Sequence, residues 1–435
     1  RRNGAASEDG YRRTYDWRPG ESRKSRNRNE MVNKRSISYT VDVIMSLLYQ
    51  DSRKPYRRRY CKIMEDGLMK YRILPNGTKI STIGIGVGNY AGARVEPEEI
   101  ERIFQTAFEH GVNFFDTCMS ASAPSQAVAK AIFGKRSQLI MQNHLCVSYP
   151  DGNYRHTTNL AQVKDAFALE LKKYGTDYSD LGIIHFVDED KDITRMVESG
   201  IVDYALELKK EGMIRNVGFS SHTPSVARKM LDAGPFDVMF FGINAGYDYE
   251  VSGEGLILSP ERTALYQECA KRGMAITVMK AYNNGQLLDE RLSPFGRAMT
   301  TEQCLQYALD RPAVVSCLAG AITASEMEQT LQFYDAPAEQ RDYSFIGALQ
   351  SKEMAGSCTY CNHCQPCPAG IDIGAVNKYF DLAKVGDQLA VEHYKALSQN
   401  ASDCTGCGVC VKRCPFHVDA KSRMEEIARF FSDIK

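Results

Sequence analysis

The chain has 435 residues, which at roughly 150 residues per domain indicates two or three domains, and 43% of its residues are hydrophobic, enough for a sizeable core. Lys and Arg total 54, as do Asp and Glu, so the formal net charge is zero and no nucleic-acid partner is indicated. No apolar run approaches the roughly 18 residues of a membrane helix, and the composition excludes collagen, coiled-coil arrays and wholesale disorder.

The N-terminal segment is basic, with 17 Lys and Arg against 7 Asp and Glu in residues 1–62. Its apolar periodicity is weak outside Ile37–Tyr49. A basic arm for nucleic acid or for an acidic membrane would need interleaved aromatic residues or a recognition helix, and the segment shows neither. It also lacks the apolar run and cleavage site of a signal peptide. We therefore predict a basic, disordered extension over residues 1–66.

A β-hairpin is predicted at the start of the folded part. Met69–Leu74 and Lys79–Ile83 are β-rich runs, and they flank a Pro75-Asn76-Gly77 turn in which Asn-Gly accepts positive φ. Regular alternation of strand and helix patterns follows, and it continues to about residue 340.

Eight short β-rich runs are each followed by an amphipathic helical stretch. The predicted strands are Ile83–Val87, Asn113–Asp116, Leu139–His144, Leu181–His185, Asn216–Ser221, Val238–Ile243, Ala275–Met279 and Val314–Leu318. The predicted helices are Pro97–His110, Ser125–Phe133, Leu160–Tyr174, Val202–Glu211, Pro224–Ala233, Pro260–Arg272, Thr301–Leu309 and Ser325–Tyr334. Three helices have Pro at their first position, which is a start signal. Eight such units predict a (β/α)8 TIM barrel over residues 67–340.

One motif favours a doubly wound sheet instead. Gly86-Val-Gly88-Asn-Tyr-Ala91 fits the dinucleotide fingerprint G-x-G-x-x-G/A between a strand and a helix. Glycines in a first βα loop are equally explained by a tight turn. The eight units and the preceding hairpin suit a barrel better.

Polar residues cluster at the predicted strand ends, where barrels carry their chemistry. They are Asp116, His144, His185, Ser220, Ser221, His222, Asn244 and Lys280. A carboxylate beside imidazoles orients a ring for acid/base work near neutral pH, so we expect Asp116, His144 and His185 to form a catalytic group. Taken singly, each would as easily cap a helix or close the core.

Eight of the fourteen cysteines lie between residues 358 and 414. Two runs each close in Cys-Pro. The second run, C-x2-C-x2-C-x3-C, has the bacterial ferredoxin spacing, in which the fourth Cys ligates the other [4Fe–4S] cluster, and the first run is one residue short before Cys367. One predicted ligand set is Cys358, Cys361, Cys364 and Cys414; the other is Cys404, Cys407, Cys410 and Cys367. Structural zinc is the alternative, and disulfides are disfavoured without a signal peptide. We expect a small ferredoxin-like α-helical domain over 341–435, with a helix over Gly374–Leu397.

The sequence resembles the aldo/keto reductases, in particular a bacterial branch fused to a C-terminal ferredoxin-like domain. The segments that carry the resemblance are LPNGTKISTIGIGVGNYAG, GVNFFDT (111–117), DYSDLGIIH (177–185), IRNVGFSSHTP (214–224), VMKAYNNGQLL (278–288) and CNHCQPCPAG (361–370). The resemblance implies a barrel that binds NADPH or NADH and moves hydride to or from a carbonyl. It also implies a tetrad of Asp, Tyr, Lys and His, of which Asp116 and His185 match.

The site departs from the family pattern at several positions. Ala121 stands where Tyr is expected, and His144 stands where Lys is expected. In the Ser-Asn pair that binds the nicotinamide carboxamide, Ser220 is kept and Ser221 replaces Asn, while Phe240 aligns with the Gln near the ring. The loop after the eighth strand lacks the Arg and Asn that grip the adenosine phosphate and adenine. Cofactor contacts are therefore expected from the two serines, Asn244 and Lys280, and proton donation from His144 or His185.

Three function classes remain open. The favoured one is a cytoplasmic oxidoreductase that takes a small organic substrate and a nicotinamide, with clusters that exchange electrons with a ferredoxin or flavoprotein. The second is a non-redox isomerase or lyase that uses the His/Asp group for proton transfer. The third is an electron carrier or redox sensor with a catalytically degenerate barrel.

Overall fold

The computed structural model describes residues 69–118, 123–150, 154–252, 255–348, 356, 358, 360, 362–384 and 388–434. The predicted basic extension over 1–66 lies outside these residues, as do Ala121 and Cys361. None of the helices in the described ranges is long and apolar enough to cross a membrane.

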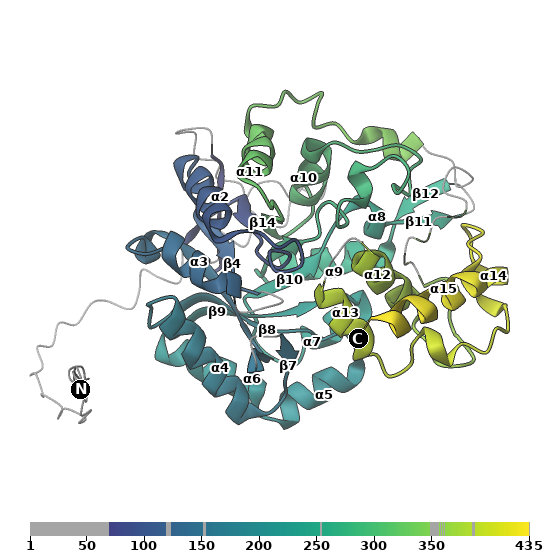
Figure 1. Cartoon of the computed structure of the whole chain (residues 1–435), viewed down its shortest axis with the longest axis horizontal. Helices are drawn as coiled ribbons and strands as arrows, with labels where there is room; N and C mark the ends of the chain where they lie inside the picture. The colour runs from purple at the N-terminus through teal and green to yellow at the C-terminus, as the bar shows by residue number, and fades with distance from the viewer. Residues whose placement is uncertain are drawn as a thin grey trace, which may run out of the picture. The chain divides into compact units, whose positions relative to one another are not determined.

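Eight parallel strands form a closed barrel, which confirms the predicted fold and excludes the doubly wound sheet (Figure 1). The barrel strands are β3 (Ile83–Ile85), β4 (Phe114–Asp116), β5 (Ile140–Leu145), β8 (Ser179–Ile184), β9 (Ile214–Ser221), β10 (Val238–Gly242), β13 (Ala275–Met279) and β14 (Val314–Ala319). They follow chain order around the ring, with β14 pairing with β3 to close it. Their carboxyl ends therefore meet at one rim.

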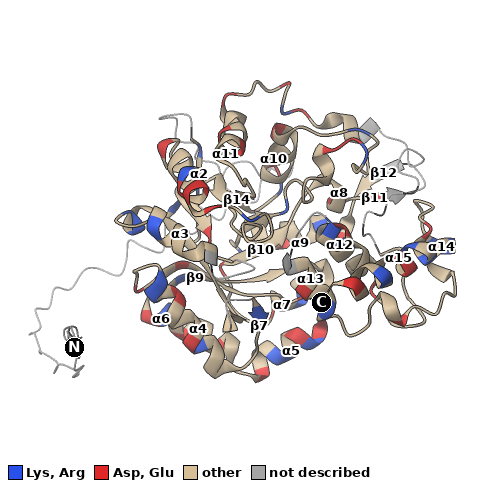
Figure 2. Cartoon of the chain, in the orientation of Figure 1, with Lys and Arg blue, Asp and Glu red and all other residues tan. Residues whose placement is uncertain are grey.

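All eight predicted barrel helices are present. They are α2 (Pro97–Glu109), α3 (Ala123–Ala131), α4 (Leu160–Lys173), α6 (Ile201–Glu211), α7 (Pro224–Met230), α9 (Pro260–Lys271), α10 (Thr301–Leu309) and α11 (Ala324–Leu331). The structure adds α5 (Asp190–Glu198), α8 (Ala245–Asp248), the strand pairs β6–β7 (Val147–Ser148, Arg155–His156) and β11–β12 (Tyr249–Ser252, Gly255–Leu258), and 3-10 turns at 136–138, 286–288, 332–334, 344–348 and 401–403. Charged residues of both signs alternate along the outer helices (Figure 2).

The predicted hairpin closes the amino end of the barrel. Strands β1 (Tyr71–Ile73) and β2 (Lys79–Ser81) pair antiparallel. Arg72 donates hydrogen bonds to the carbonyl oxygens of Leu309 and Val314, which ties the hairpin to the barrel. Leu74 and Ile80 pack into the barrel interior. Among the described residues, this packing leaves the carboxyl rim as the side from which a ligand reaches the barrel.

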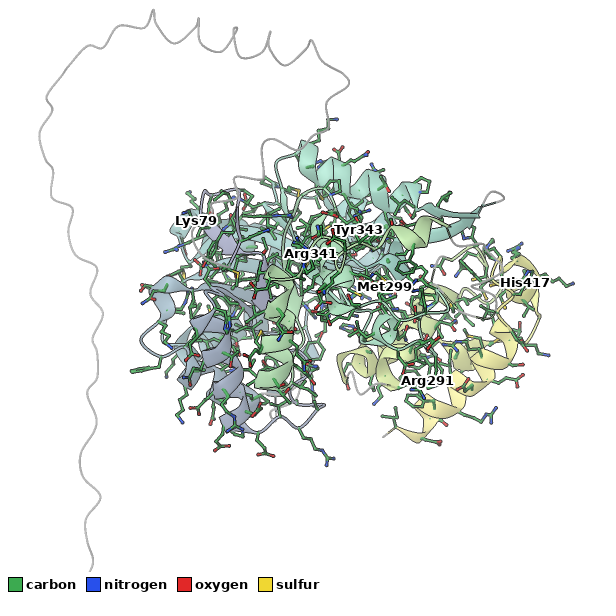
Figure 3. All side chains as sticks on the ribbon, turned by 90° about the horizontal axis from the view of Figure 1, so that it is seen from above. Lys79, Arg291, Met299, Arg341, Tyr343 and His417 are labelled. Atoms are coloured by element: carbon green, nitrogen blue, oxygen red, sulfur yellow. The ribbon has the colours of Figure 1, made fainter. Side chains whose placement is uncertain are left out.

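The segment after α11 is tied back to the barrel through Tyr343, which Figure 3 labels. The Tyr343 hydroxyl receives a hydrogen bond from Arg311 Nη2 at 3.0 Å and donates to Asp310 Oδ2 at 2.8 Å. Its ring packs edge-on against Tyr307 of α10. These contacts hold the chain on the barrel surface before it enters the C-terminal part.

The C-terminal part is helical, as predicted, but the single helix over Gly374–Leu397 is wrong. Two helices, α12 (Ile373–Lys384) and α13 (Gln388–Lys395), pack against each other there. The sequence between them contains Gly386-Asp387, which favours a break in a helix. The apolar periodicity on either side of this pair favours one continuous helix, and the prediction followed it. Helices α14 (Val409–Arg413) and α15 (Ala420–Asp433) complete this part.

Gly218→Ala is expected to lower the free energy of unfolding by about 2–4 kcal/mol, because its Cβ would overpack the barrel wall. That Cβ would lie 2.2 Å from the carbonyl oxygen of Val238, a backbone atom on the neighbouring strand β10. Gly320→Ala is the control, since its Cβ would meet nothing closer than 3.8 Å. Anaerobic thermal unfolding measures both. Equal melting midpoints for the two variants would contradict the close approach.

Candidate active site

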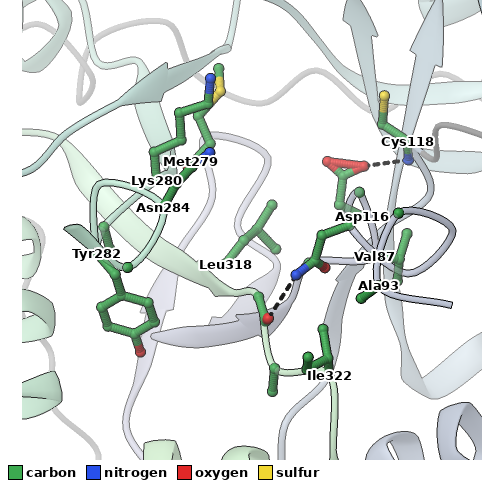
Figure 4. A pocket seen from close by; sticks show the side chains of 18 of the residues that line it. Val87, Ala93, Asp116, Cys118, Met279, Lys280, Tyr282, Asn284, Leu318 and Ile322 are labelled. Atoms are coloured by element: carbon green, nitrogen blue, oxygen red, sulfur yellow. Dashed lines mark hydrogen bonds between the residues drawn. The ribbon is translucent and has the colours of Figure 1, made fainter. Parts of the chain in front are cut away.

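A cavity of about 620 Å³ opens at the carboxyl rim of the barrel. Its walls include the loop after β3, the ends of β4, β8, β9 and β10, and the loops after β13 and β14. Figure 4 shows Asp116 and Cys118 on one side and Lys280 and Tyr282 on the other. This is the end of a (β/α)8 barrel at which ligands bind.

Asp116, the last residue of β4, is the anchor of the polar wall. Its carboxylate accepts the backbone N–H of Cys118 at 2.6 Å, Nε2 of Gln142 at 2.9 Å and Nε2 of His144 at 3.0 Å. Thr277 Oγ1 donates to Gln142 Oε1 at 2.9 Å, so the Gln142 amide presents its NH2 to Asp116. Three donors therefore hold one buried carboxylate in a fixed orientation.

The two predicted histidines continue this chain of hydrogen bonds. A carboxylate only accepts, so His144 Nε2 carries the proton toward Asp116. His144 Nδ1 lies 2.9 Å from His185 Nδ1. Burial, and then the neighbouring His144, hold the pKa of His185 well below its usual value. The structure thus brings Asp116, His144 and His185 together, and Asp116 and His185 line the cavity.

His185 keeps one nitrogen for a ligand. Its side chain is fully buried, and no described residue bonds to its Nε2.

Two tyrosines of the strand-end loops bear on the phenol that the family pattern expects at position 121. Tyr282, a cavity residue, directs its ring away from Asp116 (Figure 4). Tyr90 is fully buried, and burial raises the pKa of its phenol.

Four of the eight motif cysteines surround a second, small cavity. They are Cys367, Cys404, Cys407 and Cys410, one of the two predicted ligand sets. Cys358, Cys364 and Cys414 of the other set are half-buried. Gly406 and Gly408 have φ of +66° and +69°, which lets the backbone wrap closely around the cysteines. The backbone N–H of Gly406 donates to Cys404 Sγ at 3.4 Å.

Comparison with known proteins identifies both parts. The model of the aldo/keto reductase family matches residues 82–297. The chain carries an aldo/keto reductase domain. The model of a 4Fe-4S dicluster domain matches residues 357–418. The chain is thus an oxidoreductase of the aldo/keto reductase type with an iron–sulfur domain at its C-terminal end.

Similar proteins cover the reductase domain. "Uncharacterized oxidoreductase YqkF" of Bacillus subtilis is 25% identical over 65% of this chain and 96% of its own length. "Aldo-keto reductase YhdN" of the same organism is 29% identical over 34% of this chain and 46% of its own length. The holo form of aldo-keto reductase AKR11C1 from Bacillus halodurans superposes with a TM-score of 0.52 at 23% identity, covering 65% of this chain and 96% of that one. This likeness supports the barrel fold.

Two of the four predicted cofactor residues of the reductase domain face the cavity. Ser220 lines it, and Ser220 Oγ accepts the backbone N–H of Phe186 at 2.8 Å. Lys280 also lines it, with Nζ 3.4 Å from His222 Nε2. Phe240, which the alignment with the family put near the nicotinamide ring, forms part of the same wall.

The other two, Ser221 and Asn244, are not among the described lining residues. Ser221 Oγ donates to Asp188 Oδ1 at 3.2 Å. Asn244 caps α8 by accepting the N–H of Tyr247 at 2.9 Å, and its Nδ2 donates to the carbonyl of Lys280 at 2.9 Å. Their side chains hold the rim loops in place.

The dicluster domain supplies part of the cavity wall, which the sequence did not indicate. His393 of α13 lines the cavity and stacks on Phe186 with ring centroids 3.8 Å apart. Tyr379 of α12 donates to Asp188 Oδ2 at 3.0 Å. His222 Nδ1 contacts the same oxygen at 2.8 Å. A histidine or tyrosine on an amphipathic helix has the pattern of a core residue, so no local signal marks either one.

Lys378→Met is expected to raise stability at pH 6.5 and to have little effect near pH 10. Burial lowers the pKa of Lys378 to about 7. The negative charge of Asp188 opposes this shift, and the positive charge of Lys280 increases it. The unfolded chain keeps this proton up to its higher pKa, so stability rises with pH from about 7 to 10 by about 2–4 kcal/mol. Anaerobic melting across that range should show a smaller slope for the variant. Lys210→Met, at an exposed position, is the control, and equal slopes in both variants would contradict the buried cation.

Proposed function

We propose that the reductase domain moves hydride between NADPH or NADH and a small carbonyl or alcohol substrate. In the same proposal, two 4Fe-4S clusters in the dicluster domain exchange single electrons with a ferredoxin or a flavoprotein. The observation that carries the proposal is the Asp116–His144–His185 chain at the wall of the cavity. Because His144 Nε2 carries the proton, His144 Nδ1 accepts from His185 Nδ1, and His185 Nε2 is an acceptor without a partner among the described residues. A buried acceptor of this kind costs free energy until a donor pairs with it, which suits His185 Nε2 to the hydroxyl group of an alcohol substrate.

The cavity walls fit a nicotinamide. Phe240 offers an aromatic face, and no described residue accepts the hydroxyl hydrogen of Ser220, which is free to meet a carboxamide oxygen. Lys280 is a cationic group in the wall for a phosphate. When bound, a nicotinamide supplies or accepts the hydride. The chain's own residues orient the substrate: Asp116 fixes His144, and His144 fixes His185 beside the oxygen that gains or loses a proton.

The cysteines fit iron–sulfur clusters by donor type and grouping. Cys367, Cys404, Cys407 and Cys410 around one cavity would hold one cluster, and Cys358, Cys361, Cys364 and Cys414 would hold the other. Bound clusters supply one-electron transfer. Clusters of this kind are oxygen-sensitive, so we expect the protein to work in a reducing compartment such as the cytoplasm.

Binding of NADH and NADPH to the anaerobically purified full chain tests the proposal. We expect saturable binding of at least one of them, followed by bleaching of the visible cluster absorption. Ser220→Ala should weaken binding about tenfold, the value of one hydrogen bond, whereas Ser221→Ala should not, because Ser221 does not line the cavity. Lack of binding to either cofactor would overturn hydride transfer.

Proton transfer without redox chemistry is the second candidate. It is favoured because His144 replaces the lysine and the phenol of Tyr282 points away from Asp116 (Figure 4). This candidate predicts exchange of substrate C–H for deuterium in heavy water without any nicotinamide. The first candidate requires the cofactor for turnover, so one assay separates the two.

A further inference from the structure

We infer that Cys118, His144 and His185 form a binding site for a divalent metal ion of the zinc type. Each residue offers one ligand atom, and the three atoms lie within 4.8 Å of one another. All three side chains are buried. One thiol and two imidazoles are the ligands that zinc takes, whereas magnesium and calcium take oxygen ligands.

The two imidazoles approach each other through their Nδ1 atoms. His144 Nε2 bonds to Asp116, so His144 Nδ1 is the nitrogen left for a metal. It lies 2.9 Å from His185 Nδ1. Two nitrogens at about 2.0–2.1 Å from a tetrahedral zinc ion stand about 3.3–3.4 Å apart, so the pair would need to separate by a few tenths of an ångström and turn both lone pairs toward the ion.

Asp116 is placed as the carboxylate that supports a metal-binding histidine. A ligating histidine usually donates its second N–H to a carboxylate, which fixes the ring and increases its basicity. His144 does this to Asp116, and Gln142 and Thr277 brace the same carboxylate. Asp116 also accepts the backbone N–H of Cys118 at 2.6 Å, so one side chain positions two of the three ligands.

The surroundings indicate a catalytic rather than a structural site. Aromatic rings of Phe240 and Tyr154 pack edge-on against the two imidazoles, which limits access of water. Cys118 and His185 line the 620 Å³ cavity, so a fourth ligand would reach the ion from there. Three protein ligands with an open fourth position are typical of catalytic zinc.

The role of this ion rests on the proposed function, although the site itself rests on geometry. As a Lewis acid, the ion would stabilise the negative charge that develops on a carbonyl oxygen. In that reaction the carbonyl carbon would receive hydride from the reduced nicotinamide, which would be oxidised, the π-electron pair would move to oxygen, and a solvent proton would complete the alcohol. The ion would thus do the work for which the resemblance expects a tyrosine phenol.

X-ray absorption at the zinc edge of the anaerobically purified full chain tests the site, before and after one equivalent of Zn²⁺ and desalting. We expect about one zinc per chain, with one sulfur at about 2.3 Å and two or three light atoms at about 2.0–2.1 Å. Cys118→Ala and His185→Gln should lose this zinc and keep their iron. Cys146→Ala and His156→Gln are matched controls that should keep both metals.

Two results would overturn the site. A shell of four sulfurs would place the zinc among the dicluster cysteines, and zinc content unaffected by Cys118→Ala and His185→Gln would place it elsewhere. Nicotinamide binding to the same preparations separates the two proposals. If zinc binds and neither nicotinamide cofactor does, the metal site stands and the hydride-transfer function is overturned. If a cofactor binds and zinc does not, the hydride-transfer function stands and the metal site is overturned.

Discussion

We expect His144→Ala and His185→Ala each to lower kcat by about 10²–10⁴, the range typical of removing a positioned group that acts on the reacting oxygen. His144 is the link between Asp116 and His185, so either substitution breaks the same chain of contacts. The measurement is nicotinamide-linked turnover of small aldehydes and alcohols under anaerobic conditions. Both substitutions act as one unit, so the double variant should lose little more than either single one.

The control for this result is His110→Ala. His110 is exposed at the end of α2, where its Nδ1 contacts the carbonyl of Thr106 in its own helix. Turnover should therefore stay within experimental error of the unsubstituted protein. Full activity in both His144→Ala and His185→Ala would remove the proposed catalytic group.

The second large expected effect is a loss of iron and sulfide when two of the motif cysteines are substituted together. If Cys367 and Cys404 hold the same cluster, Cys367→Ala/Cys404→Ala should lose about half of the iron and sulfide, no more than either single variant. Cys364→Ala/Cys404→Ala touches both predicted clusters and should lose nearly all of the iron. Iron analysis and visible absorption of anaerobic preparations measure both.

Cys146→Ala is the control for the iron measurements. Cys146 is buried, and burial raises the pKa of its thiol to about 12, as expected for a packing residue. The iron content of the Cys146→Ala variant should therefore equal that of the unsubstituted protein. Equal iron loss in the two double variants would contradict the crossed ligand sets.

The barrel was predictable because its signals are local. Each strand is a short β-rich run, and Pro97, Pro224 and Pro260 mark helix starts that the structure places at the same residues. Helix α5 was not predicted because its sequence is mostly charged, with few buried residues, and it is stabilised by a capping box between Glu189 and Asp192. The sequence did not predict two separate helices in place of α12 and α13, because the apolar periodicity continues from one to the other.

The polar end of the cavity could be predicted from the sequence with one topological rule, whereas its outer wall could not. Parallel strands end at one rim, so Asp116, His144 and His185 were expected to meet, and the structure brings them within hydrogen-bond distance. His393 reaches the cavity only because α13 packs on the barrel, about 200 residues along the chain from Phe186. A contact of that sequence separation has no local pattern to reveal it.

The position of His393 links metal supply to the shape of the substrate cavity. The helix that carries this residue lies between the two cysteine runs, so its placement depends on a domain whose folding we expect to require iron and sulfide. A chain made during iron shortage would then contain a folded barrel whose pocket lacks one wall. Cluster assembly would in this way serve as a maturation step for an active site that lies in another domain.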